Sequence, residues 1–188
     1  MQVIDPTVSQ RKFDEQLKQF RRAERVQRGR GIFLLNAVFP DMEFLFTIPR
    51  LNPLSVLFSV RINFDNYDLE PLSIRFINPL SGEYLPLASV PLYRKIEHPD
   101  RPPELQALVQ KDGIGLPFIC MPGTREYHAH PAHTGDAWLR HRGLAGEGTL
   151  GFLLDKLYDY GIAPVTAFQG LFQAQALSVN IDLNLIPT

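Results

Sequence analysis

Most side chains that could carry out chemistry lie in one short segment, residues 120–142. This segment holds the only cysteine of the chain, Cys120, and its only tryptophan, Trp138, together with the carboxylates of Glu126 and Asp136. Four of the five histidines also lie here: His128, His130, His133 and His141. Such a density of ligand-type and nucleophilic side chains, in a chain with so few histidines, indicates a functional site.

The first interpretation of the segment is a metal site. Thiolate, imidazole and carboxylate are the ligands of Zn(II) and of some other first-row metals. If the stretch EYHAH is extended, Glu126, His128 and His130 fall on one face, because side chains alternate along a strand. A proline then ends the strand so that His133 can fold back, and a Pro-Gly turn can bring Cys120 close.

Two other interpretations stay open. Cys120 could be a nucleophile whose pKa is lowered by a nearby histidine, which competes with metal binding because a zinc-bound thiolate is a poor carrier. Alternatively, the histidines could be satisfied hydrogen-bonding groups beside Tyr127 and Trp138, and the cysteine an ordinary core residue. Asp136 and His141 are expected to support ligands or to cap helices, and Trp138 is expected in the core.

Composition excludes several classes of protein. The chain has 188 residues, of which 45% are apolar and 21% charged, as in an ordinary globular domain that needs no metal or disulfide to fold. A net charge of −1 gives no general affinity for nucleic acid or for an anionic membrane. The single cysteine excludes an internal disulfide and fits the cytoplasm. We find no signal peptide, membrane span, glycine-rich phosphate loop, G-x-S-x-G, H-E-x-x-H or CxxC pattern.

A helix and a meander of strands precede the segment. Within residues 1–30, apolar side chains recur every three or four positions: Phe13, Leu17, Phe20, Ala23 and Val26. This helix is strongly basic, which indicates either a solvated face or a docking face for an acidic partner. Four short apolar runs then predict antiparallel strands: IFLLNAVF, MEFLFTI, VLFSVRINF and LSIRFIN. The third alternates cleanly, with one face made of Val56, Phe58, Val60, Ile62 and Phe64.

The rest of the chain is less regular. Residues 78–116 are rich in proline, which forbids central strands, although residues 102–113 could form a short helix. The run LPFIC then leads to Cys120. Residues 147–161 predict a helix capped by Thr149, with an apolar face of Leu150, Leu153, Leu154 and Leu157. Residues 178–186 alternate as a terminal strand that closes the sheet or pairs with a partner.

The pattern C-x5-E-x-H-x4-H resembles a bacterial family defined by a Cys-Glu-His-His signature and described as a predicted metal-binding domain. Its members are encoded beside bacterial ubiquitin-like proteins, their activating and conjugating enzymes and JAB-type isopeptidases, in systems connected with defence against phage. The resemblance covers most of the chain, but its specific part is residues 116–142. It implies Zn(II), or another first-row metal, on Cys120, Glu126, His128 and His133, with His130 as a substitute ligand.

The order of elements is also similar to the ubiquitin-conjugating enzyme fold, in which a helix and four strands precede a proline-rich stretch and the catalytic cysteine. Cys120 lies roughly where that cysteine falls, and residues 63–82 resemble the strand, turn and flap of those enzymes. Two features depart from the pattern. No His-Pro-Asn triplet precedes Cys120, since His98 and Pro99 are followed by Asp100, and one helix and a strand replace the C-terminal pair of helices.

We therefore expect one α+β domain over residues 1–188, built as in the ubiquitin-conjugating fold, with a metal site in residues 120–142. The function implied by the resemblance is a component of a bacterial ubiquitin-like protein conjugation pathway. Its expected partners are the ubiquitin-like protein and its activating or conjugating enzyme, with no nucleic acid and no membrane. One alternative is a conjugating enzyme with Cys120 as thioester nucleophile. A weaker alternative is a metal-dependent hydrolase with Glu126 as general base.

Overall fold

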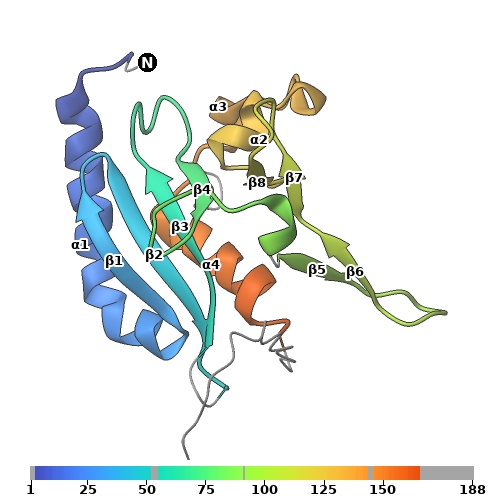
Figure 1. The fold of residues 1–188 in the computed structure, drawn as a ribbon. Helices are drawn as coiled ribbons and strands as arrows, with labels where there is room; N and C mark the ends of the chain where they lie inside the picture. Colours follow the sequence, from blue (N-terminus) through green and yellow to red (C-terminus); the bar gives the residue numbers. More distant parts are fainter. Residues whose placement is uncertain (1–2, 52–54, 91, 144–145, 166–188) are drawn as a thin grey trace, which may run out of the picture.

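The computed structural model describes residues 3–51, 55–90, 92–143 and 146–165, which form a mixed α+β fold (Figure 1). Helix α1 (Pro6–Gly29) is followed by four strands: β1 (Ile32–Val38), β2 (Asp41–Ile48), β3 (Ser55–Asn63) and β4 (Ser73–Ile77). These strands form an antiparallel sheet in the order β1-β2-β3-β4. The predicted helix and four-strand meander are thus confirmed.

Local chemistry explains where α1 begins and which face it buries. The Asp5 side chain accepts the backbone N–H of Thr7, and Pro6 occupies the first turn, where its missing N–H costs nothing. Phe13 and Phe20 are buried against the sheet, as the periodicity predicts. The prediction is wrong for Val26, which is 65% exposed, because it lies about 120° around the helix from Phe20.

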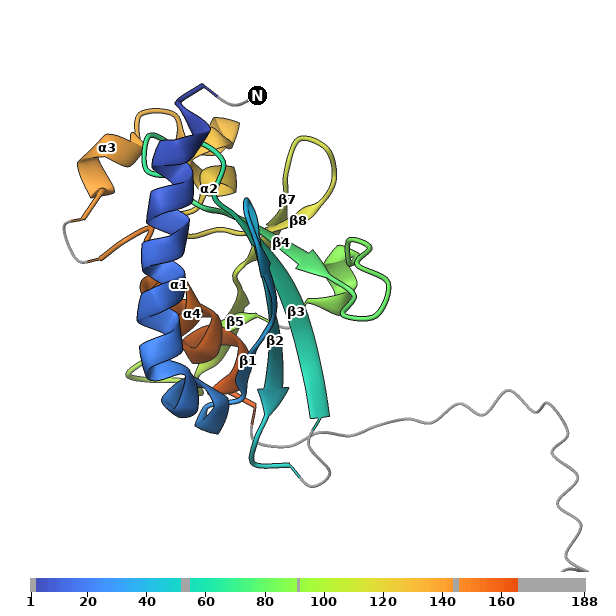
Figure 2. The same cartoon turned by 90° about the vertical axis from the view of Figure 1, so that its left-hand side faces the viewer.

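The core lies between one face of the sheet and the two longest helices. Figure 2 shows α1 and α4 (Leu150–Leu157) on the same side of the sheet. Thr149 caps α4 by accepting the backbone N–H of Phe152, and the predicted apolar face of α4 is buried. A π-helical turn, η3 (Tyr158–Ile162), continues it. Fully buried side chains of the sheet face these helices, among them Met42, Phe44, Phe46, Val60, Ile62 and Ile74.

One residue of β3 departs from the predicted alternation. Val56 was expected on the buried face, yet it is 55% exposed. The pairing of β2 with β3 shifts register between Phe46 and Thr47, so the strand bulges at this end. The bulge turns Val56 outward while Phe58 still stacks on Phe46, with ring centroids 4.7 Å apart.

The proline-rich region forms two small hairpins instead of extending the central sheet. After a short 3-10 turn, η1 (Leu87–Ser89), β5 (Tyr93–Ile96) pairs with β6 (Glu104–Ala107), and β7 (Val109–Lys111) pairs with β8 (Pro117–Ile119). The helix predicted over residues 102–113 is therefore wrong. A helix of that length is marginal on its own, whereas each strand gains a partner by pairing. Figure 1 shows the β5–β6 hairpin extending away from the body of the molecule.

The histidine segment is helical. It forms α2 (Arg125–Ala129), a 3-10 turn η2 (Pro131–His133) and α3 (Trp138–His141). The expectation that EYHAH is extended, with Glu126, His128 and His130 on one face, is wrong. The predicted strand 178–186 lies outside the described residues. In the part of the chain that the structure describes, no helix is long and apolar enough to cross a membrane.

Candidate functional site

Cys120 and His133 form a thiol–imidazole pair. Cys120 follows directly after β8, and its backbone N–H donates to the carbonyl of Leu108 at 2.8 Å, so the end of the strand fixes its position. Its Sγ lies 3.5 Å from Nε2 of His133, and the thiol is partly exposed. The structure thus brings together two residues that the sequence singled out, 13 positions apart.

The ring of His133 is held by its neighbours on α2 and η2. The ring of Tyr127 stacks on it with centroids 3.9 Å apart and planes 20° from parallel. The phenol of Tyr127 donates to Oδ2 of Asp136 at 2.8 Å, and burial, followed by this bond, raises the pKa of Tyr127 to about 12. The ring centroid of His130 lies 5.6 Å from that of His133. The imidazole that faces Cys120 is therefore set in place by stacking.

The thiol of Cys120 differs from the activated nucleophile that the sequence suggested. Burial raises the pKa of the Cys120 thiol above its ordinary value, whereas the nucleophile interpretation predicts a pKa lowered by a nearby histidine. Near neutral pH the group is therefore a protonated thiol. A reaction at sulfur needs a base to take the proton, and His133 is the base within reach.

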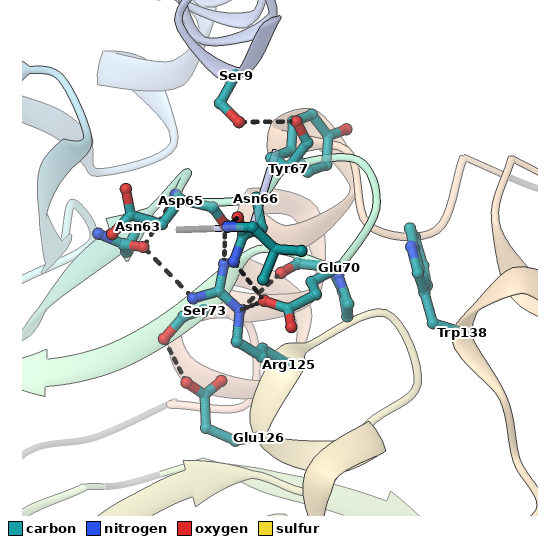
Figure 3. Close-up of polar contacts among 12 residues, drawn as sticks. Ser9, Asn63, Asp65, Asn66, Tyr67, Glu70, Ser73, Arg125, Glu126 and Trp138 are labelled. Carbon is teal, nitrogen blue, oxygen red and sulfur yellow. Dashed lines mark hydrogen bonds and ion pairs between the residues drawn. The ribbon is translucent and has the colours of Figure 1, made fainter. Parts of the chain in front are cut away.

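Glu126 has a different role from the predicted one. Its side chain is buried, and its carboxylate accepts the hydroxyl of Ser73 in a short hydrogen bond and the backbone N–H of Ile74 at 3.1 Å. Nε of Arg75 lies 3.5 Å from the same carboxylate. Figure 3 shows Glu126 turned toward Ser73. These contacts fasten α2 to β4.

The neighbouring Arg125 forms a second clamp on the loop between β3 and β4. Its guanidinium donates to the carbonyls of Pro71 and Asp65 and to Oδ1 of Asn63, and it lies 3.5 Å from the carboxylate of Glu70. Figure 3 shows this fan of contacts around the guanidinium. The start of α2 is thereby held on two sides by residues that come more than 50 positions earlier in the chain.

His128 is fully engaged by hydrogen bonds within the segment. Its Nε2 accepts the backbone N–H of Gly123 at 3.1 Å, so Nδ1 carries the proton and donates to the carbonyl of Asp136 at 2.7 Å. Burial lowers the pKa of His128, which keeps it neutral. The side chain of Asp136 meanwhile bonds His141 and Tyr127, and these bonds lower its pKa.

Trp138 anchors α3, as the expectation of a core residue predicts. The side chain is 7% exposed, and its indole N–H donates to the carbonyl of Asp68 at 3.3 Å. The carboxylate of Asp68 also pairs with Lys12 of α1 and with Arg142. The end of the segment is thus tied to α1 as well as to the β3–β4 loop.

The four predicted metal ligands therefore do not converge on one point in the structure. Cys120 and His133 lie together, while the carboxylate of Glu126 and both ring nitrogens of His128 bond to other groups. Among the described residues, no group of three or more His, Cys, Asp or Glu side chains is arranged to hold a metal ion. The thiol and imidazole fit two positions of a zinc site, and the four-ligand set stays a prediction.

Sequence reasoning missed two residues that support the site, Ser73 and Arg75, and named Tyr127 only as a neighbour of the histidines. One signal was available, because Arg75 is the only charged residue in the run LSIRFIN. A pocket of about 390 Å³ adjoins this support. Its lining includes Arg75, Asp112, Ile114, Glu126, His130 and Pro131. His130 therefore connects the pocket to the thiol–imidazole pair, because its ring centroid lies 5.6 Å from that of His133.

Comparison with known proteins shows one family and one relative to which the chain is similar. The model of the Y4jH-like family, described as the Y4jH family, matches residues 4–165. The uncharacterized protein y4jH of Sinorhizobium fredii (strain NBRC 101917 / NGR234) is 39% identical over 184 residues. The match covers 90% of this chain and 89% of that relative.

The first prediction concerns Glu126. In Glu126→Gln, the side chain loses its negative charge, so the hydrogen bonds with Ser73 and Ile74 are no longer charge-assisted and Arg75 loses its ion pair. We expect the free energy of unfolding in urea to fall by about 1–3 kcal/mol. Glu97→Gln is the control, because its side chain is 68% exposed, and we expect a change within about 0.5 kcal/mol. Equal stability of the Glu126 variant and the parent protein would contradict a structural role.

The second prediction concerns the only thiol of the chain. Because burial raises the pKa of Cys120, the rate of alkylation by iodoacetamide should have its inflection at a higher pH in the folded protein than in urea. The unfolded chain is the matched control, since it contains the same single cysteine. An inflection at lower pH in the folded protein would instead show a thiolate stabilised by His133.

Proposed function

We propose that this chain, which belongs to the Y4jH-like family, is a component of a bacterial ubiquitin-like protein conjugation pathway, of the type connected with defence against phage. Its functional centre would be the pair Cys120–His133, and the observation that carries the proposal is the 3.5 Å contact between Sγ and Nε2. The partners are the ubiquitin-like protein and its activating or conjugating enzyme. The pathway is proposed to work in the cytoplasm, where a lone thiol stays reduced.

The scaffold supports this proposal. A helix followed by a four-strand antiparallel meander resembles the ubiquitin-conjugating fold, and Cys120 follows the proline-rich region as the catalytic cysteine does there. The His-Pro-Asn triplet of those enzymes is missing before Cys120. In this chain an imidazole after the cysteine, His133, occupies the position beside the thiol instead.

The chemistry that fits the pair is transfer of an acyl group between thiols. The sulfur of Cys120 would attack the carbonyl carbon of a thioester that links the ubiquitin-like protein to its activating enzyme. A new C–S bond forms, the old C–S bond breaks, and the proton of Cys120 passes through His133 to the departing thiolate. A protonated thiol in the resting protein requires such a base, because burial raises its pKa.

The pocket beside His130 supports the same role. A protein chain attached to Sγ must leave the site along the surface, and the pocket of about 390 Å³ is lined by His130, whose ring centroid lies 5.6 Å from that of His133. Ile114 and Pro131 provide apolar wall, while Arg75 is paired with Asp112 at 2.6 Å. Because these charges are already neutralised, the pocket suits an uncharged extended peptide better than an ion.

A metal site is the second candidate function. Cys120 and His133 would supply two ligands for Zn(II) or another first-row metal, and His130 is the next imidazole. Bound metal would hold the thiolate and stabilise the segment. Glu126 and His128 would join only after giving up their bonds to Ser73 and Gly123. The same bond to Ser73 argues against the hydrolase alternative, because it occupies the proposed general base.

The third prediction tests the carrier function. Incubation of the metal-free protein with ATP, the ubiquitin-like protein and its activating enzyme should give an adduct that dithiothreitol cleaves. Cys120→Ala should form none, and His133→Ala should slow its formation about 100-fold or more, because the base is lost. His98→Ala is the control, since this histidine lies outside the segment. Folded, metal-free protein that forms no adduct would refute the carrier function.

The fourth prediction tests the metal candidate. Elemental analysis of protein purified without chelators should find about one Zn(II) or similar ion per chain. His133→Ala should remove it, Cys120→Ser should weaken it, and His98→Ala should keep it. Chelation should leave the far-ultraviolet circular dichroism largely unchanged, because the apolar core is built mainly from residues outside the segment, which contributes Met121 and Trp138. Zinc-loaded protein should form no adduct, because coordination withdraws the lone pair of sulfur. A metal-free preparation would exclude this candidate.

A further inference from the structure

Positive charge is concentrated on α1. The helix carries seven basic and three acidic side chains, a net charge of +4. The whole chain has a net charge of −1 with neutral histidines, so the remaining residues carry −5. The excess of positive charge is therefore confined to α1, and the net charge of the whole chain does not reveal it.

Only some of these basic side chains have partners within the molecule. Lys12 pairs with Asp68 at 2.7 Å, and Arg21 and Arg28 both pair with Glu24 at 2.8 Å. Four other cations of α1 are exposed, and none forms an ion pair with a carboxylate in the part of the chain that the structure describes. These four, which we term the basic stripe, are Arg11, Lys18, Arg22 and Arg25.

The basic stripe is narrow, straight and turned away from the core. At 100° per residue its members fall within about 60° of arc, and they extend over about 20 Å of helix. The stripe lies about 120–180° around the helix from Phe13 and Phe20, which face the sheet. Figure 2 shows α1 at the front of the molecule with no other described element in front of it.

The immediate surroundings of the stripe favour a protein partner. Val26 lies one turn after Arg22 on the helix surface and is 65% exposed, so it offers an apolar contact next to the cations. The two acidic residues near the stripe, Asp14 and Glu15, lie toward its N-terminal end, and Asp14 bonds Gln10. The C-terminal part, from Lys18 to Arg25, therefore carries no carboxylate on this face, where the neutral Gln19 and the apolar Val26 accompany the cations.

We infer that the basic stripe binds an acidic helix of a partner protein. A line of cations one residue wide and about 20 Å long matches a helix whose carboxylates recur with the same spacing of seven, four and three positions. A nucleic-acid duplex fits less well, because four cations on a chain with a net negative charge make few phosphate contacts. The inference does not depend on the chemistry at Cys120.

Two synthetic helical peptides of identical composition serve as the probes. In one, glutamates follow the spacing of the stripe, and in the other the same glutamates are spread around the helix. Fluorescence anisotropy at low salt should show the matched peptide binding at least about tenfold more tightly than the spread peptide. Arg22→Glu/Arg25→Glu should abolish this binding, and Arg22→Gln/Arg25→Gln should weaken it. These substitutions lie on the face opposite the core, so circular dichroism should show an intact fold.

Arg94→Glu/Lys95→Glu in the β5–β6 hairpin is the matched control, because it changes the net charge of the protein by the same amount. It should bind the matched peptide as the parent protein does. Equal binding of the two peptides would overturn the inference, as would undiminished binding by Arg22→Glu/Arg25→Glu or an equal loss in the control. Tighter binding of a DNA duplex with the same number of charges would show a nucleic-acid site instead.

Discussion

The position of the candidate site depends on one buried carboxylate. Glu126 is only 6% exposed, and a charge at that depth is tolerated only when its oxygens are hydrogen-bonded. Ser73, the backbone N–H of Ile74 and the guanidinium of Arg75 meet this requirement, and all three belong to β4. Because α2 lies between Cys120 and η2 in the chain, fixing α2 on β4 also fixes how closely His133 approaches the thiol.

The parts of the fold that could be predicted from the sequence are those in which a regular apolar pattern continues over many consecutive residues. Helix α1, the four strands and α4 each repeat an apolar pattern over enough residues to decide between a helix and a strand. Residues 126–130 are too few for such a decision. The helical form of Arg125–Ala129 is set by the contacts of Glu126 and Arg125 with the β3–β4 region, and Ser73 lies 53 positions from Glu126 in the chain. No spacing rule could have identified that partner.

The cluster of histidines was predictable, but the separate role of each ring was not. His128 uses both ring nitrogens within the segment, His133 faces the thiol, and His130 lines the pocket with its ring centroid 5.6 Å from that of His133. These differences arise because the segment turns from α2 into η2 after His130, so successive histidines point to different neighbours. A dense cluster of ligand-type side chains therefore does not by itself define a ligand set.

The candidate site and the basic stripe lie at opposite edges of the sheet. Helix α1 packs on β1 at one edge, whereas α2 and β8 pack on β4 at the other. Figure 1 shows α1 and α2 at opposite sides of the sheet. The apolar face of α1 is used by Phe13 and Phe20 for the core, so its basic face can bind a partner without disturbing the packing. A protein held on that face would leave Cys120 open to a second protein, which is the arrangement that transfer between two proteins requires.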